Sequence, residues 1–167
     1  MITLSEIIFG GITMIEDSST DITSYGYGYY NSNGELYTAG SGSSYGNTYA
    51  SGDIIGIALD ITNSKIYFSK NGAWSDGSGS WDSSTFNASV GAVTITAPAS
   101  TNNGHYFFGS GDYESGSQPT WEWNFGGCPP NTISSGNSDE NGYGNFEYAV
   151  PSGYLALCTK NLGSDGG

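Results

Sequence analysis

Hydrophobic residues alternate with small or polar ones along two neighbouring segments in the middle of the chain. Every second residue of segment 55–61 is Ile or Leu, and Ile and Phe alternate with Lys, Tyr and Ser in segment 65–69. A period of two places such side chains on one face of a β-strand. Residues 62–64 between them are Thr, Asn and Ser, which favour turns. Asn71 and Gly72 tolerate the positive φ of a tight corner. The pattern predicts a β-hairpin.

The rest of the chain consists of short apolar or aromatic segments separated by turns rich in Gly, Ser and Asn. We expect further strands over residues 7–14, 25–30, 35–38, 90–96, 105–108, 120–125, 146–150 and 154–159. The loops are expected over residues 40–46, 73–87 and 128–144. Roughly nine to eleven short strands at this spacing predict an all-β antiparallel sandwich with no significant helix.

The composition agrees with this fold class. Gly accounts for 27 of the 167 residues, aromatic residues for 14% and charged residues for 11%. These values are typical of many short strands joined by turns. The length suits a single domain, which we place at residues 1–162, followed by a flexible tail at residues 163–167.

The charge balance excludes one class of partner. The net charge is −13, and the positive side chains are Lys65, Lys70 and Lys160. No basic patch can form, so we expect no binding to nucleic acid. No signal peptide or apolar segment of transmembrane length is visible, so we expect no membrane insertion. Cys128 and Cys158 are too few for a disulfide framework, and we expect both to be buried free thiols rather than a bridge.

The central hairpin also resembles a known family. The Gly-Asp pair at 52–53, the apolar strand, the turn and the aromatic strand running into SKNG at 69–72 are similar to the central hairpin of SPRY domains. The resemblance extends to residues 24–30, 43–53, 105–113 and 121–127, and it covers residues 8–162. It implies two antiparallel sheets in a bent, concanavalin-like sandwich. It also implies a protein that has no catalytic activity and binds other proteins through its loops.

The C-terminal segment VPSGYLALCTKNL, at residues 150–162, is similar to the end of SPRY domains found in bacteriophage structural proteins. This likeness implies a virion protein, assembled in the host cytoplasm and exposed on the virion surface as a tail fibre, capsid or other tail-associated module. Its partners would be other virion proteins, a host surface protein or a host glycan. Homo-oligomers are common among such modules. Two alternatives remain open, namely an intracellular SPRY-type adaptor that binds peptides and a glycan-active enzyme of concanavalin-like fold.

One departure from the family concerns the start of the fold. SPRY domains usually begin with an aromatic-rich strand, whereas segment 7–13 here resembles a later strand with little before it. Either the first strand is missing, or the chain is the end of a larger protein. An incomplete sheet exposes an edge, which invites pairing with another subunit.

A search for catalytic residues favours a protein that is not an enzyme. Glycoside hydrolases need two carboxyl groups about 5–10 Å apart across a cleft. Glu122 lies between two tryptophans on an expected strand, and no second acid shares its face. Acids of the preceding loop could approach Glu122, but nothing in the spacing requires it. His105 is the single histidine and is expected at a surface or sheet edge.

Binding is the better prospect, because several aromatic residues fall in polar loops. Exposed Tyr and Trp rings suit recognition at low entropic cost. We expect Trp81 to be exposed, whereas Trp74 either packs under its loop or meets a partner. The candidate binding residues are Trp74, Trp81, Tyr45, Tyr49, Tyr113 and Tyr143. The loop acids also offer the oxygen ligands of a calcium site, without the spacing of an EF-hand. Its candidates are Asp76, Asp82, Asp112 and Glu114.

Overall fold

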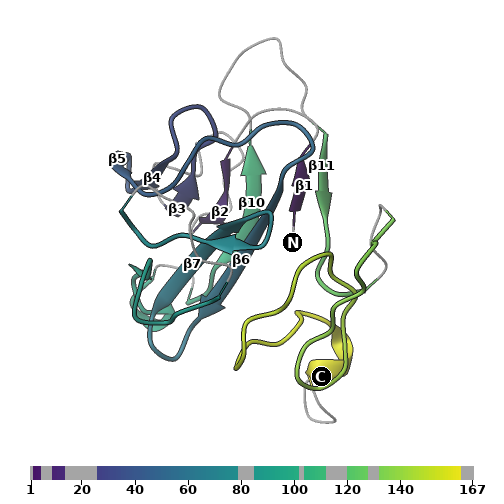
Figure 1. The fold of residues 1–167 in the computed structure, drawn as a ribbon. Coiled ribbons are helices and arrows are strands. Elements are labelled where there is room, and N and C mark those ends of the chain that lie inside the picture. Colours follow the sequence, from purple (N-terminus) through teal and green to yellow (C-terminus); the bar gives the residue numbers. More distant parts are fainter. Residues whose placement is uncertain are drawn as a thin grey trace.

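The protein folds into two antiparallel β-sheets packed face to face (Figure 1). The computed structural model describes residues 2–4, 9–13, 26–78, 85–101, 104–111, 120–127 and 132–162. For residues 2–4 and 9–13 it describes the backbone alone. The described part contains strands and two short 3-10 helices, η1 (Pro98–Ser100) and η2 (Thr159–Asn161), and neither helix is long and apolar enough to cross a membrane. The expected all-β sandwich is confirmed.

Each sheet is assembled from strands that are not all neighbours in sequence. The first sheet, sheet A, has the order β11 (Trp121–Trp123), β1 (Ile2–Leu4), β6 (Ile54–Asp60), β7 (Lys65–Lys70) and β8 (Ala73–Trp74), and β9 (Val93–Thr94) also pairs with β7. The second sheet, sheet B, has the order β10 (Phe107–Gly111), β2 (Phe9–Thr13), β3 (Gly26–Tyr29), β4 (Glu35–Thr38) and β5 (Ser41–Ser44).

The predicted central hairpin is formed by β6 and β7. Ile57 lies opposite Phe68 in the register. Ile55 and Phe68 are 1% and 0% exposed, as the period of two predicts for the core face. Ile61, expected on the same face, is 45% exposed. It is exposed because β6 ends at Asp60 and the chain has already entered the turn.

Tyrosine rings fill much of the space between the two sheets. Tyr29 is fully buried, and its ring centroid lies 4.8 Å from that of Tyr49. The Tyr49 hydroxyl donates to the Tyr29 carbonyl at 2.7 Å, and the Tyr45 hydroxyl donates to the Gly91 carbonyl at 2.9 Å. A buried phenol is tolerated when its hydroxyl finds such a partner.

The expected loop at residues 40–46 is wrong, because Ser41–Ser44 form the edge strand β5. Ala39 and Gly40 both have positive φ, 48° and 81°. Two consecutive residues with positive φ make the type I′ turn that joins tight hairpins. Ser and Gly have low intrinsic strand preference, so the sequence pattern alone did not indicate this strand.

Two expected strands near the C-terminus are also wrong. Phe146 forms only an isolated bridge with Asn137, and residues 154–159 are not a strand. Pro151 and Gly153 interrupt this stretch, and both residues disfavour a regular ladder. The expected strand at 90–96 is reduced to β9. The short strand β1 was not expected, and it occupies the position between β11 and β6.

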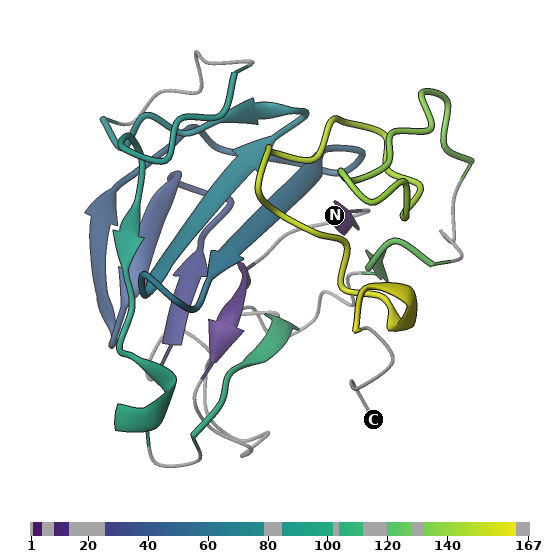
Figure 2. The same cartoon turned by 90° about the horizontal axis from the view of Figure 1, so that it is seen from below.

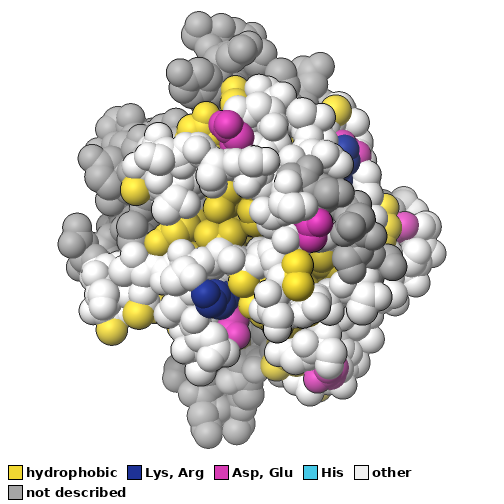
Figure 3. Space-filling view, turned by 60° about the vertical axis from the view of Figure 1, so that its left-hand side comes forward, with side chains coloured by type: hydrophobic (Ala, Val, Ile, Leu, Met, Phe, Trp, Pro, Cys, Tyr) yellow, Lys and Arg dark blue, Asp and Glu magenta, His cyan; other side chains and the backbone are white. Residues whose placement is uncertain are grey.

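The C-terminal segment, which we define as residues 146–157, lies beside sheet A rather than within it. Figure 2 shows this segment, coloured yellow, running next to β6 and β7. On the face drawn in Figure 3, hydrophobic side chains gather in a hollow near the centre, with a few charged side chains scattered around it. This face therefore offers an apolar recess rather than a continuous field of one charge.

Candidate functional site

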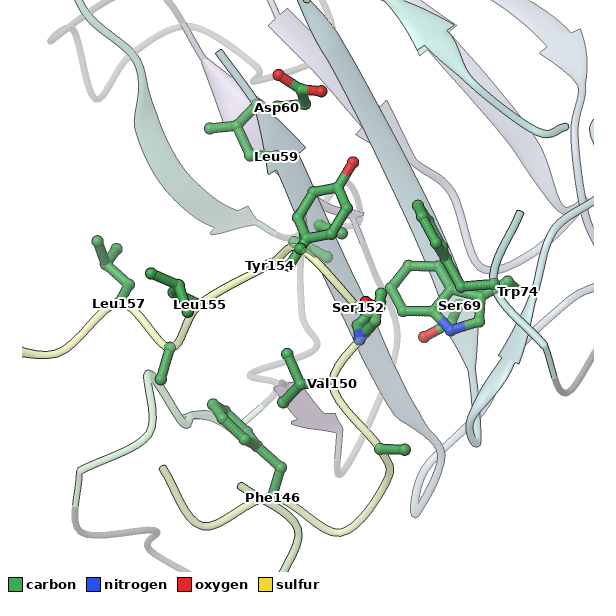
Figure 4. A pocket seen from close by; sticks show the side chains of 18 of the residues that line it. Leu59, Asp60, Ser69, Trp74, Phe146, Val150, Ser152, Tyr154, Leu155 and Leu157 are labelled. Atoms are coloured by element: carbon green, nitrogen blue, oxygen red, sulfur yellow. The ribbon is translucent and has the colours of Figure 1, made fainter. Parts of the chain in front are cut away.

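A groove of about 830 Å³ lies between β6 and the C-terminal segment (Figure 4). One wall is the continuous stretch 56–63, which includes most of β6 and the turn after it. The other wall is stretch 148–157, and residues 123–125, which begin at the last residue of β11, close a further side. We call this space the β6 groove.

An aromatic cluster on the outer face of β6 and β7 forms one end of the β6 groove. Trp74 packs edge-on against Phe86 with ring centroids 5.1 Å apart, and Phe86 packs against Tyr154 at 5.2 Å. Tyr154 also contacts Tyr67 at 6.1 Å. Burial raises the pKa of the Tyr154 hydroxyl, and the neighbouring Tyr67 and Asp60 raise it further. The hydroxyl therefore stays protonated at neutral pH.

Small residues keep the sheet surface low beneath this cluster. A Cβ atom on Gly56 would lie 2.3 Å from Ser69 Oγ, so a larger residue there would require the Ser69 side chain to move. Ala58, the next residue on the same face, is 5% exposed and packs with Tyr67 and Trp74. The aromatic rings can consequently rest directly on the strands.

The C-terminal segment is held in place by the buried carboxylate of Asp139, which is 7% exposed. Its Oδ2 accepts the N–H of Ala156 at 2.9 Å and the side-chain amide of Asn161 at 2.6 Å. Its Oδ1 accepts the N–H groups of Asn141 at 3.0 Å and Tyr143 at 2.9 Å. Burial alone would raise the pKa of Asp139, but these donors outweigh burial and lower it.

Two further contacts fix the groove wall. Glu140 Oε1 accepts the N–H of Gly153 at 2.9 Å, and this hydrogen bond and one from the Ser152 hydroxyl lower the pKa of Glu140. Gly72, with φ of 82°, receives the ring of Tyr148, and a Cβ there would lie 2.6 Å from Tyr148 Cδ1. The glycine of the KNG motif thus accommodates the C-terminal segment as well as the turn.

The same motif closes the end of the hairpin through polar contacts. Asp53 Oδ2 lies 3.1 Å from Lys70 Nζ, and Asn71 Nδ2 donates to Asp53 Oδ1 at 2.6 Å. Asn71 Oδ1 accepts the Ile54 N–H at 2.8 Å. Partial burial would raise the pKa of Asp53, but the N–H of Ala50 and these partners lower it. The Gly-Asp and KNG motifs therefore have a structural role.

Large apolar side chains are exposed along the rim of the β6 groove. Leu155 is 49% exposed, Leu157 55%, Phe125 39% and Ile61 45%, and all four line the groove. Figure 4 shows Leu155 and Leu157 farther along the groove than Tyr154, away from Trp74. Exposed apolar side chains that gather around one groove in this way favour an interaction site.

The expected binding residues are distributed differently. Trp74 is 9% exposed and packs under its loop, although it also lines the β6 groove. Tyr45 and Tyr49 are 4% and 3% exposed and belong to the core, so the surface offers neither ring to a partner. Tyr143 is 37% exposed, with Lys160 Nζ 5.4 Å from its ring centroid, and it does not line the groove. Trp81 and Tyr113 lie outside the described residues.

Of the four expected calcium ligands, Asp76 alone lies in the described part of the chain. Asp76 Oδ1 accepts the Ser78 N–H at 2.7 Å, whereas Asp82, Asp112 and Glu114 lie outside the described residues. Among the residues that are described, no group of three or more His, Cys, Asp or Glu side chains could hold a metal ion. The calcium site stays a prediction.

The β6 groove offers little of the chemistry that an enzyme of this fold class would need. Among its described lining residues Asp60 alone carries a carboxylate, and Glu122 does not line it. The Asn63 side chain and N–H lower the pKa of Asp60. His105 stacks edge-on against Phe107 with centroids 4.8 Å apart. Cys158 is a half-buried free thiol, and Cys128 lies outside the described residues.

Sequence reasoning did not identify the β6 groove, because its walls lie far apart along the chain. Segment 150–162 was singled out by its likeness to the end of phage SPRY domains, and residues 154–159 within it were expected to form a strand. The signal in the sequence was the alternation of Leu155 and Leu157 soon after Pro151 and Gly153, which disfavour a regular strand.

Two comparisons with known proteins bear on the family. Residues 15–87 match the family model of the SPRY domain. The chain is also 41% identical, over 54 residues, to the dual specificity protein kinase splA of Dictyostelium discoideum. That alignment covers 29% of this chain and 2% of the kinase, so the likeness concerns a short segment of a much longer protein. SPRY domains are protein-binding modules, and the match from residue 15 to residue 87, which includes β3 to β8, supports the SPRY resemblance and a protein partner for this chain.

Proposed function

We propose that this chain is a non-enzymatic binding module of a bacteriophage virion and that it holds its partner in the β6 groove. The observation that carries the proposal is the exposed apolar rim at Leu155 and Leu157, held in position by the buried Asp139. An exposed leucine side chain is less stable in water than in an apolar contact, so covering it with a partner favours complex formation. Fully burying one such side chain contributes roughly 1.5–3 kcal/mol.

The rigidity of the groove wall supports binding rather than chance exposure. The loop that carries Asp139 and the stretch that carries Leu155 and Leu157 are joined by hydrogen bonds to Ala156 and Asn161. A site that is ordered before binding loses less conformational entropy on complex formation. The leucines are therefore presented by a fixed backbone, as an interaction site requires.

The virion assignment rests on the likeness of residues 150–162 to the end of phage SPRY domains. Part of this same segment forms one wall of the β6 groove. The segment that carries the likeness and the segment that exposes the leucines therefore coincide. The partner would be another virion protein, with the module placed on a fibre, the capsid surface or the tail.

A host glycan is a second candidate partner, favoured by one aromatic pair. Trp123 and Phe125 stack with centroids 5.5 Å apart and an interplanar angle of 10°, and Phe125 is 39% exposed. A flat exposed ring can stack on the apolar face of a sugar. This pair lies at the residue 123–125 side of the β6 groove.

The test compares two leucines with similar exposure but different locations. Leu157 lines the groove, whereas Leu162, 52% exposed, does not. The purified domain and its Leu157→Ser and Leu162→Ser variants are measured by calorimetry against the purified virion proteins encoded in the same genome. The same samples are applied to a glycan array with and without Ca²⁺.

We expect Leu157→Ser to weaken binding about tenfold or more, since one apolar contact of this size is worth about 1.4 kcal/mol or more. Leu162→Ser should leave the affinity unchanged, and both variants should melt like the parent. Equal affinity of the parent and Leu157→Ser for every partner that binds would show that the β6 groove is not the site. Binding only on the glycan array would replace the virion partner by a host glycan.

A further inference from the structure

Strand β5 forms one end of sheet B, and its outer edge is open. It pairs with β4, and no other described strand pairs with it. All four residues of Ser41–Ser44 are exposed. Figure 1 shows β5 at the outer end of its sheet, with the yellow C-terminal segment on the opposite side of the molecule. None of these four residues lines the β6 groove, so the edge is a separate surface.

The pairing with β4 determines which backbone groups of β5 point outward. The Glu35 carbonyl accepts a backbone N–H at 2.8 Å from the residue that follows β3, so the backbone groups of Glu35 face β3. Because these groups alternate along a strand, those of Leu36 face β5. Ser43 lies opposite Leu36 and faces β4 in return. The N–H and C=O groups of Gly42 and Ser44 therefore face outward.

The edge of β5 lacks the features that protect most strand edges. Natural sheets use charged side chains, proline or a bulge to prevent a further strand from pairing. Residues 41–44 are Ser, Gly, Ser and Ser, without a charge or a proline. The β4–β5 register also runs without a bulge, from Glu35 opposite Ser44 to Thr38 opposite Ser41. The outward backbone groups are therefore accessible to an added strand.

The space above Gly42 is occupied by two side chains of β4. A Cβ on Gly42 would lie 2.6 Å from Glu35 Oε2 and 3.1 Å from Tyr37 Cζ. Asn33 Nδ2 donates to Glu35 Oε2 at 2.7 Å and holds the carboxylate in this position. Tyr30 packs edge-on against Tyr37, with ring centroids 5.8 Å apart. Because Gly42 has no side chain, a carboxylate and an aromatic ring reach the open edge.

No lysine of the chain neutralises the Glu35 carboxylate. All three lysines lie in the described part, and none of them forms an ion pair with Glu35. Desolvation and the Glu35 charge raise the pKa of the neighbouring Tyr37 hydroxyl, so this phenol is uncharged at neutral pH. The net charge of −13 attracts a cationic partner and repels a second copy. A carboxylate beside an aromatic ring suits a Lys or Arg side chain.

We propose that the open edge of β5 binds an extended segment of another protein, with a Lys or Arg residue opposite Gly42. The added strand pairs antiparallel with β5 through the outward groups of Gly42 and Ser44. Its cationic side chain contacts the Glu35 carboxylate and the Tyr37 ring. In complexes of this kind, main-chain pairing supplies affinity and the side-chain contact supplies specificity. This second binding site goes beyond the proposed function, which concerns the β6 groove.

The first experiment tests strand addition with the peptide acetyl-Thr-Thr-Lys-Thr-Thr-amide, whose threonines favour a strand. Amide hydrogen exchange of the full ¹⁵N-labelled chain is followed by NMR with and without saturating peptide. We expect exchange to slow about tenfold or more at Gly42 and Ser44. Ser41 and Ser43 are internal controls, because their N–H groups already face β4. No binding of the peptide, or unchanged exchange at Gly42 and Ser44, overturns the inference.

Two variants of Ser44 test the backbone contact. Ser44→Pro removes the outward N–H and leaves the ladder to β4 intact, whereas Ser44→Ala removes only the hydroxyl. We expect Ser44→Pro to weaken peptide binding at least about fivefold and Ser44→Ala to bind like the parent. Melting temperatures close to that of the parent check that both variants fold. Equal affinity of the two variants for the peptide excludes strand pairing.

The charge requirement is tested with a second peptide, in which norleucine replaces Lys. We expect the parent to prefer the Lys peptide about fivefold, since an exposed ion pair and a cation–π contact both contribute. Glu35→Gln should lose this preference. Glu140→Gln removes the same charge from a residue that contacts Ser152 in the wall of the β6 groove, and it should keep the preference. Equal affinity of the parent for both peptides, or a preference that Glu35→Gln retains, overturns the cationic partner.

Two controls separate this site from the β6 groove and from self-association. Leu157→Ser, which alters the groove, should bind the Lys peptide like the parent. Weaker binding by this variant would place the peptide in the groove and overturn the inference, whereas failure of the virion proteins to bind the groove leaves the inference unaffected. Sedimentation without peptide should give the same mass for the parent and Ser44→Pro. A dimer that Ser44→Pro abolishes would assign the edge to a second copy and overturn the cationic partner.

Discussion

The Asp139 carboxylate accepts the backbone N–H of Ala156 at a distance of 2.9 Å, across 17 positions of sequence. This hydrogen bond ties the loop after residue 138 to the wall of the β6 groove. Because Ala156 lies between the exposed residues Leu155 and Leu157, the carboxylate sets the position of both. A buried polar group directly behind the groove wall therefore determines the shape of that wall.

Replacing Asp139 by Asn should loosen the C-terminal segment. The substitution replaces one carboxylate oxygen by an NH2 group, which cannot accept a hydrogen bond. At least one of the N–H donors that Asp139 now accepts, such as that of Ala156, therefore loses its acceptor. We expect the melting temperature to fall by several degrees and hydrogen exchange to quicken at Ala156. Glu140→Gln is the control, because Glu140 is exposed and accepts fewer hydrogen bonds. A variant Asp139→Asn as stable as Glu140→Gln would contradict this role.

The stability of the domain should fall in acid. The pKa values of Asp139, Glu140 and Glu147 are all lowered, from ordinary values of 3.8 for Asp and 4.5 for Glu. Hydrogen-bond donors cause the shift in each case, against the opposing effect of burial. A lowered folded-state pKa adds stability that is complete above the unfolded-state value and is lost as the pH falls through the folded-state value.

The free energy of unfolding should therefore be level at neutral pH and decline below about pH 4.5. Denaturant unfolding at a series of pH values measures this. The decline should be shallower in Asp139→Asn, which lacks one of the titrating groups. An identical decline in that variant and the parent would show that Asp139 does not contribute.

Two glycines with nearly the same backbone conformation should differ in their tolerance of a methyl group. Gly72 and Gly40 have φ of 82° and 81°. A Cβ on Gly72 would meet the Tyr148 ring at 2.6 Å, whereas a Cβ on Gly40 would meet nothing within 4 Å. Gly40→Ala should cost about 1–2 kcal/mol from backbone strain alone.

Gly72→Ala should cost more than Gly40→Ala, by about 1–3 kcal/mol, because the Tyr148 ring must also shift. Denaturant unfolding of both variants gives the difference directly. Gly72→Ala should also increase hydrogen exchange in the C-terminal segment, whereas Gly40→Ala should leave exchange in that segment unchanged. Equal costs for the two variants would mean that Tyr148 does not rest on Gly72.

Replacing Trp74 by Ala should destabilise the fold rather than specifically reduce binding. The side chain is 9% exposed and packs against Phe86, so its removal leaves a cavity. Large aromatic truncations in a core cost about 3–5 kcal/mol. Thermal unfolding should show a large fall in melting temperature. Unchanged stability would place Trp74 among the recognition residues instead.

The hairpin β6–β7 illustrates what a local pattern can predict. Its strands alternate at a period of two, its turn residues are adjacent in sequence, and its partners are neighbours. The edge strand β5 was missed because its formation depends on the positive φ of Ala39 and Gly40, which the sequence pattern did not reveal. The C-terminal segment was misassigned because its backbone groups pair with side chains such as Asp139 rather than with a ladder.

By itself, the sequence determined the all-β class, the central hairpin and the absence of a basic surface, because alternation, turn chemistry and charge are properties of short stretches or of the whole composition. Only the tertiary structure decided the β6 groove. That groove depends on a C-terminal segment that Asp139 holds beside β6. These relations join segments that are not neighbours in the sequence, and they arise only when the chain packs.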